Sequence, residues 1–204
     1  KVLISPIFFG AVDWDSNVVN VNRTREQIKN SPSIDTDKPV SRQHESNFYD
    51  YYNFPYYWLG TGLSSPEAVG LGAVAPAPSG PEAAALGQQS DSEDIHLRST
   101  KDIIGSYIET TDGDLGHLED FIFDDQNWMI RYLLIETTNW WPGKKVLISP
   151  EWVKDMVETD SRVYVDLTQE QIRTSPEYDE TTVLDRDYES RLYHHYGRPP
   201  YWSD

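Results

Sequence analysis

The chain has 204 residues, a length that allows one domain or two small ones. Its 34 acidic residues outnumber 17 basic ones, and the formal net charge is −17. This charge argues against direct binding of nucleic acid or anionic lipid, because both depend on Lys and Arg. The chain has no Cys, which excludes disulfides, thiolate zinc sites and thiol nucleophiles. No apolar run approaches the ~20 residues that a membrane span needs.

The sequence contains an internal repeat with an offset of 144 residues. The hexapeptide Lys-Val-Leu-Ile-Ser-Pro occurs at residues 1–6 and again at 145–150. An ungapped alignment of residues 1–58 with 145–202 has 23 identical positions. Chance would give only a few identities, so the pattern indicates a duplicated unit.

The two copies differ in what precedes the shared part. The second copy has a further stretch, residues 98–144, and the first has nothing before Lys1. We therefore expect residues 1–63 to be the C-terminal half of a unit, completed by an absent part of the protein, a separate chain or a symmetry mate. Without its other half, such a unit would have an unpaired sheet edge and an open apolar face, which favour association.

The segment between the copies, residues 64–97, has a different composition. Of its 34 residues, 20 are Ala, Gly, Pro or Ser, and none is Phe, Trp, Tyr, Lys or Arg. Such a composition cannot bury enough surface to fold, which predicts a flexible acidic linker. The net charge is −1 for residues 1–63, −5 for the linker and −11 for the complete unit, residues 98–204.

In chain order, residues 98–167 of the complete unit contain several short candidate strands separated by turns. Gly113 supplies positive φ to the first turn, and residues 124–127 form a polar hairpin turn. This spacing is typical of a small barrel or sandwich. The predicted strands are 107–110, 116–123, 130–137, 145–148 and 162–165. The side chains expected in the core are Leu118, Ile122, Leu133, Ile135, Val146, Ile148, Val163 and Val165.

Two short helices are predicted after the strands. Thr168 and Gln171 have capping-box spacing, and Pro176 ends that helix. Asp185 is the N-cap of a second helix, which runs to about Tyr196 and stops at Gly197.

Each copy ends in an aromatic tail, and two interpretations of the tails remain. Tyr and Trp give a large contact area at low entropic cost, so the tails could dock a protein partner. They could equally fold back and close the barrel, since large aromatic side chains are highly buried on average. The candidate partner-binding residues are Tyr49, Tyr52, Tyr57 and Trp58 in copy one, and Tyr193, Tyr196, Tyr201 and Trp202 in copy two.

No pattern in the sequence predicts catalysis, a metal site or a cofactor. The adjacent pair His194 and His195 would point about 100° apart on a helix, which disfavours chelation of one ion. The acidic residues at 112–125 lack the calcium-loop pattern and suit solvated turns. There is no nucleophile elbow and no phosphate-binding loop. We therefore expect a protein that is not an enzyme and that holds no metal or cofactor.

Several motifs of the complete unit resemble the PRC-barrel domain. They are Thr111–Gly113, Gly116–Asp120, Trp128–Leu133 and, as the most specific, Trp140–Pro150. The resemblance covers residues 98–202 and, as a half, 1–58; it is nearest to bacterial tandem PRC-barrel proteins. It implies an all-β fold, a small PRC-type barrel with short C-terminal helices, preceded by the back half of a second such unit.

The resemblance implies docking to a larger protein assembly and no catalytic residues. The family includes the cytoplasmic part of the photosynthetic reaction centre H subunit, so a subunit or assembly factor of that membrane complex is an alternative. Ribosome maturation is a second alternative, which the acidic charge disfavours. We expect a protein partner or self-association and a cytoplasmic location that includes the membrane periphery.

Overall fold

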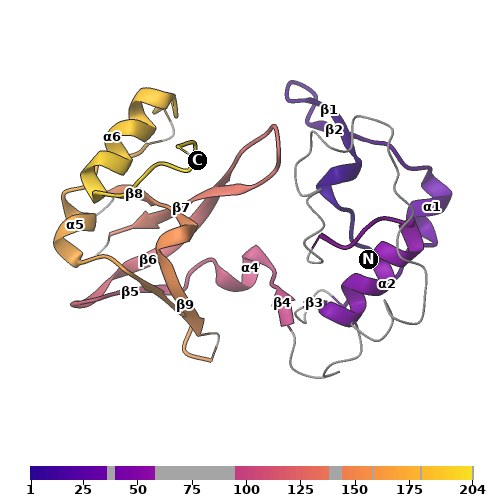
Figure 1. Ribbon diagram of the computed structural model, residues 1–204, viewed down its shortest axis with the longest axis horizontal. Helices are drawn as coiled ribbons and strands as arrows, with labels where there is room; N and C mark the ends of the chain where they lie inside the picture. The colour runs from indigo at the N-terminus through magenta and orange to yellow at the C-terminus, as the bar shows by residue number, and fades with distance from the viewer. Residues whose placement is uncertain (36–39, 58–94, 138–143, 158, 180, 204) are drawn as a thin grey trace. The chain divides into compact units, whose positions relative to one another are not determined.

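A computed structural model describes residues 1–35, 40–57, 95–137, 144–157, 159–179 and 181–203 (Figure 1). The chain divides into unit 1, Lys1–Ser99, and unit 2, Thr100–Asp204. Most of the predicted linker and the Trp140–Gly143 part of the most specific motif lie outside the described residues. The two units are described separately.

Unit 2 is built on a six-stranded sheet with the order β8-β7-β6-β5-β10-β9. Its neighbouring strands are antiparallel except for β5 and β10, which are parallel. This sheet-rich fold agrees with the predicted PRC-type architecture, although the pairing does not join β8 to β9 into a closed ring among the described residues. The strands are β5 (Tyr107–Thr110), β6 (Gly113–Phe123), β7 (Ile130–Glu136), β8 (Lys145–Ile148), β9 (Val153–Val157) and β10 (Arg162–Val165).

The five predicted strands are all present, and β5, β8 and β10 have the predicted bounds. The sixth strand, β9, was not predicted. Its sequence, Val-Lys-Asp-Met-Val, lacks an alternating pattern, and none of its side chains is fully buried. Its place at the sheet edge explains both properties, because an edge strand needs less apolar cover.

Two glycines allow β6 to begin and to approach its neighbour. Gly113 has φ +140°, as the turn prediction required. Gly116 has φ +132°, and a Cβ at this position would lie 2.1 Å from the Glu136 carbonyl oxygen of β7. The close contact between β6 and β7 at this point therefore needs glycine.

The core of unit 2 includes seven of the eight side chains predicted from the strand pattern. Each of the seven is at most 2% exposed. The eighth, Ile122, is half-buried. A register shift between Leu118 and Asp120 pairs Ile122 with Tyr132, so Ile122 lies on the opposite face of β6 from Leu118, contrary to the predicted alternation. The opposite face of β7 and β8 is also buried at Tyr132, Leu134 and Leu147, which the alternating pattern did not predict.

Helix α6 (Arg186–Tyr196) covers this second buried face (Figure 1). Its N-cap Asp185 accepts a hydrogen bond from the Tyr188 amide, and its C-cap Gly197 is left-handed, both as predicted. Helix α5 (Gln169–Arg173) has the predicted capping box of Thr168 and Gln171. The remaining helices of unit 2 are short: α4 (Thr100–Ile103) and the 3₁₀ helix η4 (Pro150–Trp152).

The described residues of unit 1 form a smaller set of elements. A two-stranded sheet pairs β1 (Phe9–Asp13) with β2 (Val18–Val21), and a second pairs β3 (Val40–Ser41) with β4 (Ile95–Leu97). β4 consists of the last three residues of the predicted linker, which are therefore part of a sheet. The helices among the described residues are η1 (Pro6–Phe8), α1 (Arg25–Lys29) and α2 (Arg42–Tyr52).

Five elements of unit 1 have the same bounds as elements of unit 2 after a shift of 144 residues. They are η1 with η4, β1 with β9, β2 with β10, α1 with α5, and α2 with α6. The bridge of Val2 with Ser33 also recurs, as Val146 with Glu177. The repeated sequence therefore adopts the same local structure twice.

Candidate docking site

The tail of unit 2 begins within α6, which presents an aromatic face to the sheet. Tyr193 is 2% exposed and Tyr196 is 4% exposed. Both rings pack on Trp152 of η4, with centroid distances of 5.4 and 4.6 Å. Burial raises the pKa of both tyrosines, so their hydroxyls stay neutral. These two residues belong to the core of the unit.

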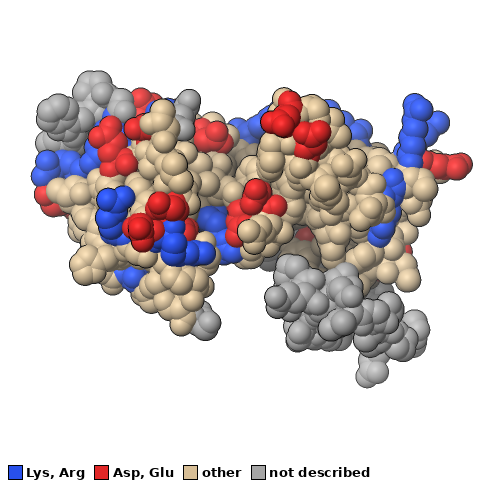
Figure 2. Space-filling model, turned by 90° about the horizontal axis from the view of Figure 1, so that it is seen from above, with Lys and Arg blue, Asp and Glu red and all other residues tan. Residues whose placement is uncertain are grey.

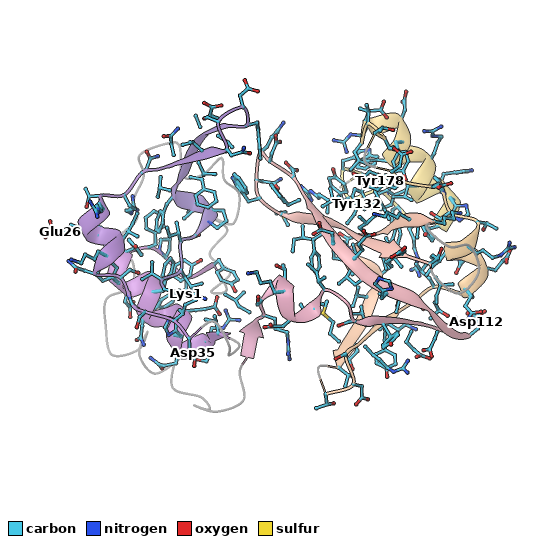
Figure 3. The ribbon with its side chains drawn as sticks, turned by 180° about the vertical axis from the view of Figure 1, so that it is seen from behind. Lys1, Glu26, Asp35, Asp112, Tyr132 and Tyr178 are labelled. Atoms are coloured by element: carbon cyan, nitrogen blue, oxygen red, sulfur yellow. The ribbon has the colours of Figure 1, made fainter. Side chains whose placement is uncertain are left out.

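A buried carboxylate, Glu189, connects α6 to the sheet and to the end of the tail. Its Oε1 accepts hydrogen bonds from the hydroxyls of Tyr132, at 2.7 Å, and Tyr201, at 3.1 Å. Its Oε2 pairs with Arg186 at 3.0 Å. Burial, followed by the hydrogen bond to Glu189, raises the pKa of Tyr132. Figure 3 labels Tyr132, which lies on the side of the sheet covered by α6.

Tyr201 and Trp202 form the outer part of the same tail. They are half-buried, and their ring centroids are 4.9 Å apart. The Arg131 guanidinium lies 4.1 Å from the Tyr201 centroid, and that of Arg186 lies 4.1 Å from the Trp202 centroid. Cations over ring faces hold the aromatic planes in place and leave part of each ring at the surface.

The tail of unit 1 is more exposed. Tyr49 and Tyr52 are half-buried, and Tyr57 is 50% exposed. The Tyr57 hydroxyl donates to Oε1 of Glu45 at 3.0 Å, and Arg42 pairs with the same carboxylate at 2.9 Å. Trp58 lies outside the described residues.

The structure brings six of the candidate residues into two equivalent clusters, Tyr49, Tyr52 and Tyr57 in unit 1 and Tyr193, Tyr196 and Tyr201 in unit 2; Trp202 joins the second. The sequence pattern did not indicate the carboxylate that accepts a hydrogen bond from the outer tyrosine of each cluster, Glu45 from Tyr57 and Glu189 from Tyr201. A signal was present, because Glu45 and Arg42 are identical to Glu189 and Arg186 in the repeat. Whether these clusters bind a partner stays a prediction.

The acidic residues at the turns have local partners. Asp112 accepts bonds from the Thr110 hydroxyl and the Gln169 amide, and the Gln169 bond is the main cause of its lowered pKa. Arg162 forms ion pairs with both Glu109 and Asp114. A hydrogen bond between the Glu109 and Asp114 carboxyl groups raises the pKa of Glu109. The face of unit 2 seen in Figure 2 has interspersed acidic and basic side chains.

The two adjacent histidines have different surroundings. His194 is exposed, whereas His195 Nε2 lies 2.7 Å from the Gln171 carbonyl oxygen. Within the described ranges, no group of three or more His, Asp or Glu side chains could hold a metal ion. The expected lack of a metal or cofactor stays a prediction.

Residues 97–172 match the family model of the PRC-barrel domain. The chain therefore carries a PRC-barrel domain, a module of the protein-interaction type, and the match begins at the end of β4 and ends within α5. No curated protein matches the chain. Among the helices that the structure describes, none has both the length and the apolar character needed to cross a bilayer.

Proposed function

We propose that the chain is a non-enzymatic adaptor, and that its PRC-barrel unit docks to a protein partner through the surface formed by Tyr201 and Trp202. The family match supports an interaction module. The proposal that the chain is not an enzyme is supported by the sequence, which has no nucleophile elbow and no phosphate-binding loop.

The observation that carries the proposal is the arrangement of the unit 2 tail. Tyr193 and Tyr196 anchor the tail in the core, and Glu189 and Arg186 fix its outer end. The partly exposed rings of Tyr201 and Trp202 are thereby held in place before any partner binds. A rigid aromatic pair loses little entropy on binding and is typical of the centre of an interface.

The test is a pull-down from an extract of the source cells with the full chain as bait. Trp202→Ala should lose the bound protein while unit 2 stays folded at the assay temperature, because the ring is only partly buried. The matched control is Val183→Ala, which removes an apolar side chain that is 74% exposed and lies outside the tail. Equal binding by Trp202→Ala and the wild type would contradict the proposal.

The same experiment separates narrower proposals about the assembly. Pigment proteins in the bound fraction would favour a reaction-centre subunit or assembly factor at the membrane periphery, and ribosomal proteins would favour ribosome maturation. Either group of proteins supports docking through Tyr201 and Trp202 only if it binds the wild type and does not bind Trp202→Ala.

A further inference from the structure

The two units provide an internal comparison that identifies a second docking surface, on unit 1. The local contacts are the same in both. The Asn22 amide donates to the Phe8 carbonyl at 2.8 Å, as the Asp166 amide does to Trp152. Phe8 lies 4.7 Å from Tyr52, as Trp152 lies 4.6 Å from Tyr196.

The burial of the equivalent apolar side chains differs. Val163 is 1% exposed in unit 2, whereas its counterpart Val19 is 41% exposed in unit 1. Counterparts of five other fully buried residues, Val146, Leu147, Ile148, Val165 and Ile172, are only half-buried: Val2, Leu3, Ile4, Val21 and Ile28. Apolar side chains that are covered within unit 2 therefore have partly exposed counterparts in unit 1, on both sides of its strands.

Unit 2 shows what covers these side chains. β8, the counterpart of residues 1–4, pairs with β7 along Leu133–Glu136. β10, the counterpart of β2, pairs with β5 along Tyr107–Glu109. Among the described residues of unit 1, no strand corresponds to β5, β6 or β7, and β2 has a strand partner on only one edge.

The buried carboxylate of unit 1, Glu45, has fewer hydrogen-bond partners than its counterpart in unit 2, and the additional partner in unit 2 comes from β7. Glu45 is 2% exposed and has the two partners that its own half supplies, Arg42 and Tyr57. Its counterpart Glu189 has a third partner, the Tyr132 hydroxyl of β7. A covering sheet with a hydroxyl at this position would complete the set of donors.

We propose that this surface of unit 1, formed by Val2–Ile4, β2 and Glu45, binds a three-stranded antiparallel sheet of the β5–β6–β7 type. One bound strand pairs with Val2–Ile4 in the antiparallel direction, as β7 pairs with β8. Another pairs with β2 in the parallel direction, as β5 pairs with β10. A tyrosine of the bound sheet donates its hydroxyl to Glu45.

The test supplies such a sheet from the chain itself. Residue 144 directly precedes Lys145, and Lys1 is the counterpart of Lys145, so a second copy of residues 98–144 is fused ahead of Lys1 of the full chain. Hydrogen exchange is then followed in the unit 1 peptides that contain Val2–Ile4 and Val18–Val21. Exchange there should slow by at least about tenfold, as expected for amides that enter a protected ladder. Peptides of unit 2 are the internal reference.

A matched control fusion carries Leu133→Asp and Ile135→Asp in the added copy alone. Both side chains are buried in unit 2, so the altered sheet cannot pack, and unit 1 should exchange as in the unfused chain. Unchanged exchange in the first fusion, or equal slowing in both fusions, would overturn the proposal. A dimer of the unfused chain that protects Val18–Val21 would assign the surface to a second copy and would also overturn it.

The role of Glu45 is tested within the same two chains. Glu45→Gln should speed exchange at Val2–Ile4 several-fold more in the first fusion than in the unfused chain, because only the fusion presents the third donor. An equal effect in both chains would overturn this part of the proposal. These readouts concern unit 1 alone, so they can fail without affecting the docking proposed for Tyr201 and Trp202.

Discussion

Units 1 and 2 show the same sequence pattern in two packing environments. Helices α1 and α5 have the same capping box, and the ends of α2 and α6 have the same left-handed cap, on Asn53 in one and Gly197 in the other. Burial differs, because among the described residues only unit 2 has strands of the β5–β7 type. The comparison teaches that residues close in sequence determine caps, turns and short helices, whereas burial depends on strands that are distant in sequence.

The largest expected difference between the units is the loss of stability when the same isoleucine of the repeat, Ile148 in unit 2 or Ile4 in unit 1, is changed to Ala. Ile148 is fully buried, and Ile148→Ala should lower the free energy of unfolding of unit 2 by ~2–4 kcal/mol through lost transfer energy and a cavity. Ile4→Ala in unit 1 should cost less than about half as much, because Ile4 is only half-buried. Urea unfolding, monitored by hydrogen exchange of the peptides of each unit, measures the free energy of unfolding of the two units separately. Equal losses would contradict the difference in burial.

The second comparison concerns the two buried carboxylates. Glu189→Gln should destabilise unit 2 by ~1–3 kcal/mol, because hydrogen bonds to a charged group are stronger than those to a neutral amide. Glu45→Gln should cost unit 1 less, since Glu45 lacks a counterpart of the Tyr132 hydroxyl among the described residues. The same unfolding measurement applies, with Glu170→Gln, whose carboxylate is on the surface of α5, as the control. A larger effect at Glu45 than at Glu189 would contradict this interpretation.

The sequence predicted most of what depends on neighbouring residues. The bounds of β5, β8 and β10, the cap residues of α5 and α6, and the inward side chains of β7 all followed from local pattern. The second buried face at Tyr132 and Leu147 did not, because α6 covers it and the pairing of α6 with the sheet joins residues more than 50 positions apart.

The aromatic tails show the same limit of sequence-based prediction. Composition identified Tyr193, Tyr196, Tyr201 and Trp202 as a group but could not separate core from surface. The structure buries the first two and leaves the others partly exposed, because Tyr193 and Tyr196 lie on the face of α6 that meets Trp152. Identity between the copies was the one signal for Glu189.

The smallest expected effect is a pH dependence of unit 2 that comes from Tyr132. Burial and the bond to Glu189 raise its pKa above the unfolded value of about 10. The folded state therefore holds its proton while the unfolded state loses it, so this contribution to stability is complete below about pH 10 and falls as the pH rises further.

Removing the hydroxyl should weaken that dependence. The stability of the wild type should fall by up to ~1.4 kcal/mol per pH unit for each such tyrosine above pH 10, and Tyr132→Phe should show a shallower fall. A residual slope should remain, because burial also raises the pKa of Tyr188, to about 12, and the pKa of Tyr196. Thermal melts of unit 2 between pH 9 and 11 measure this slope, and Tyr107→Phe, at a side chain that is 58% exposed, is the control. Identical slopes for the wild type and Tyr132→Phe would contradict the raised pKa of Tyr132.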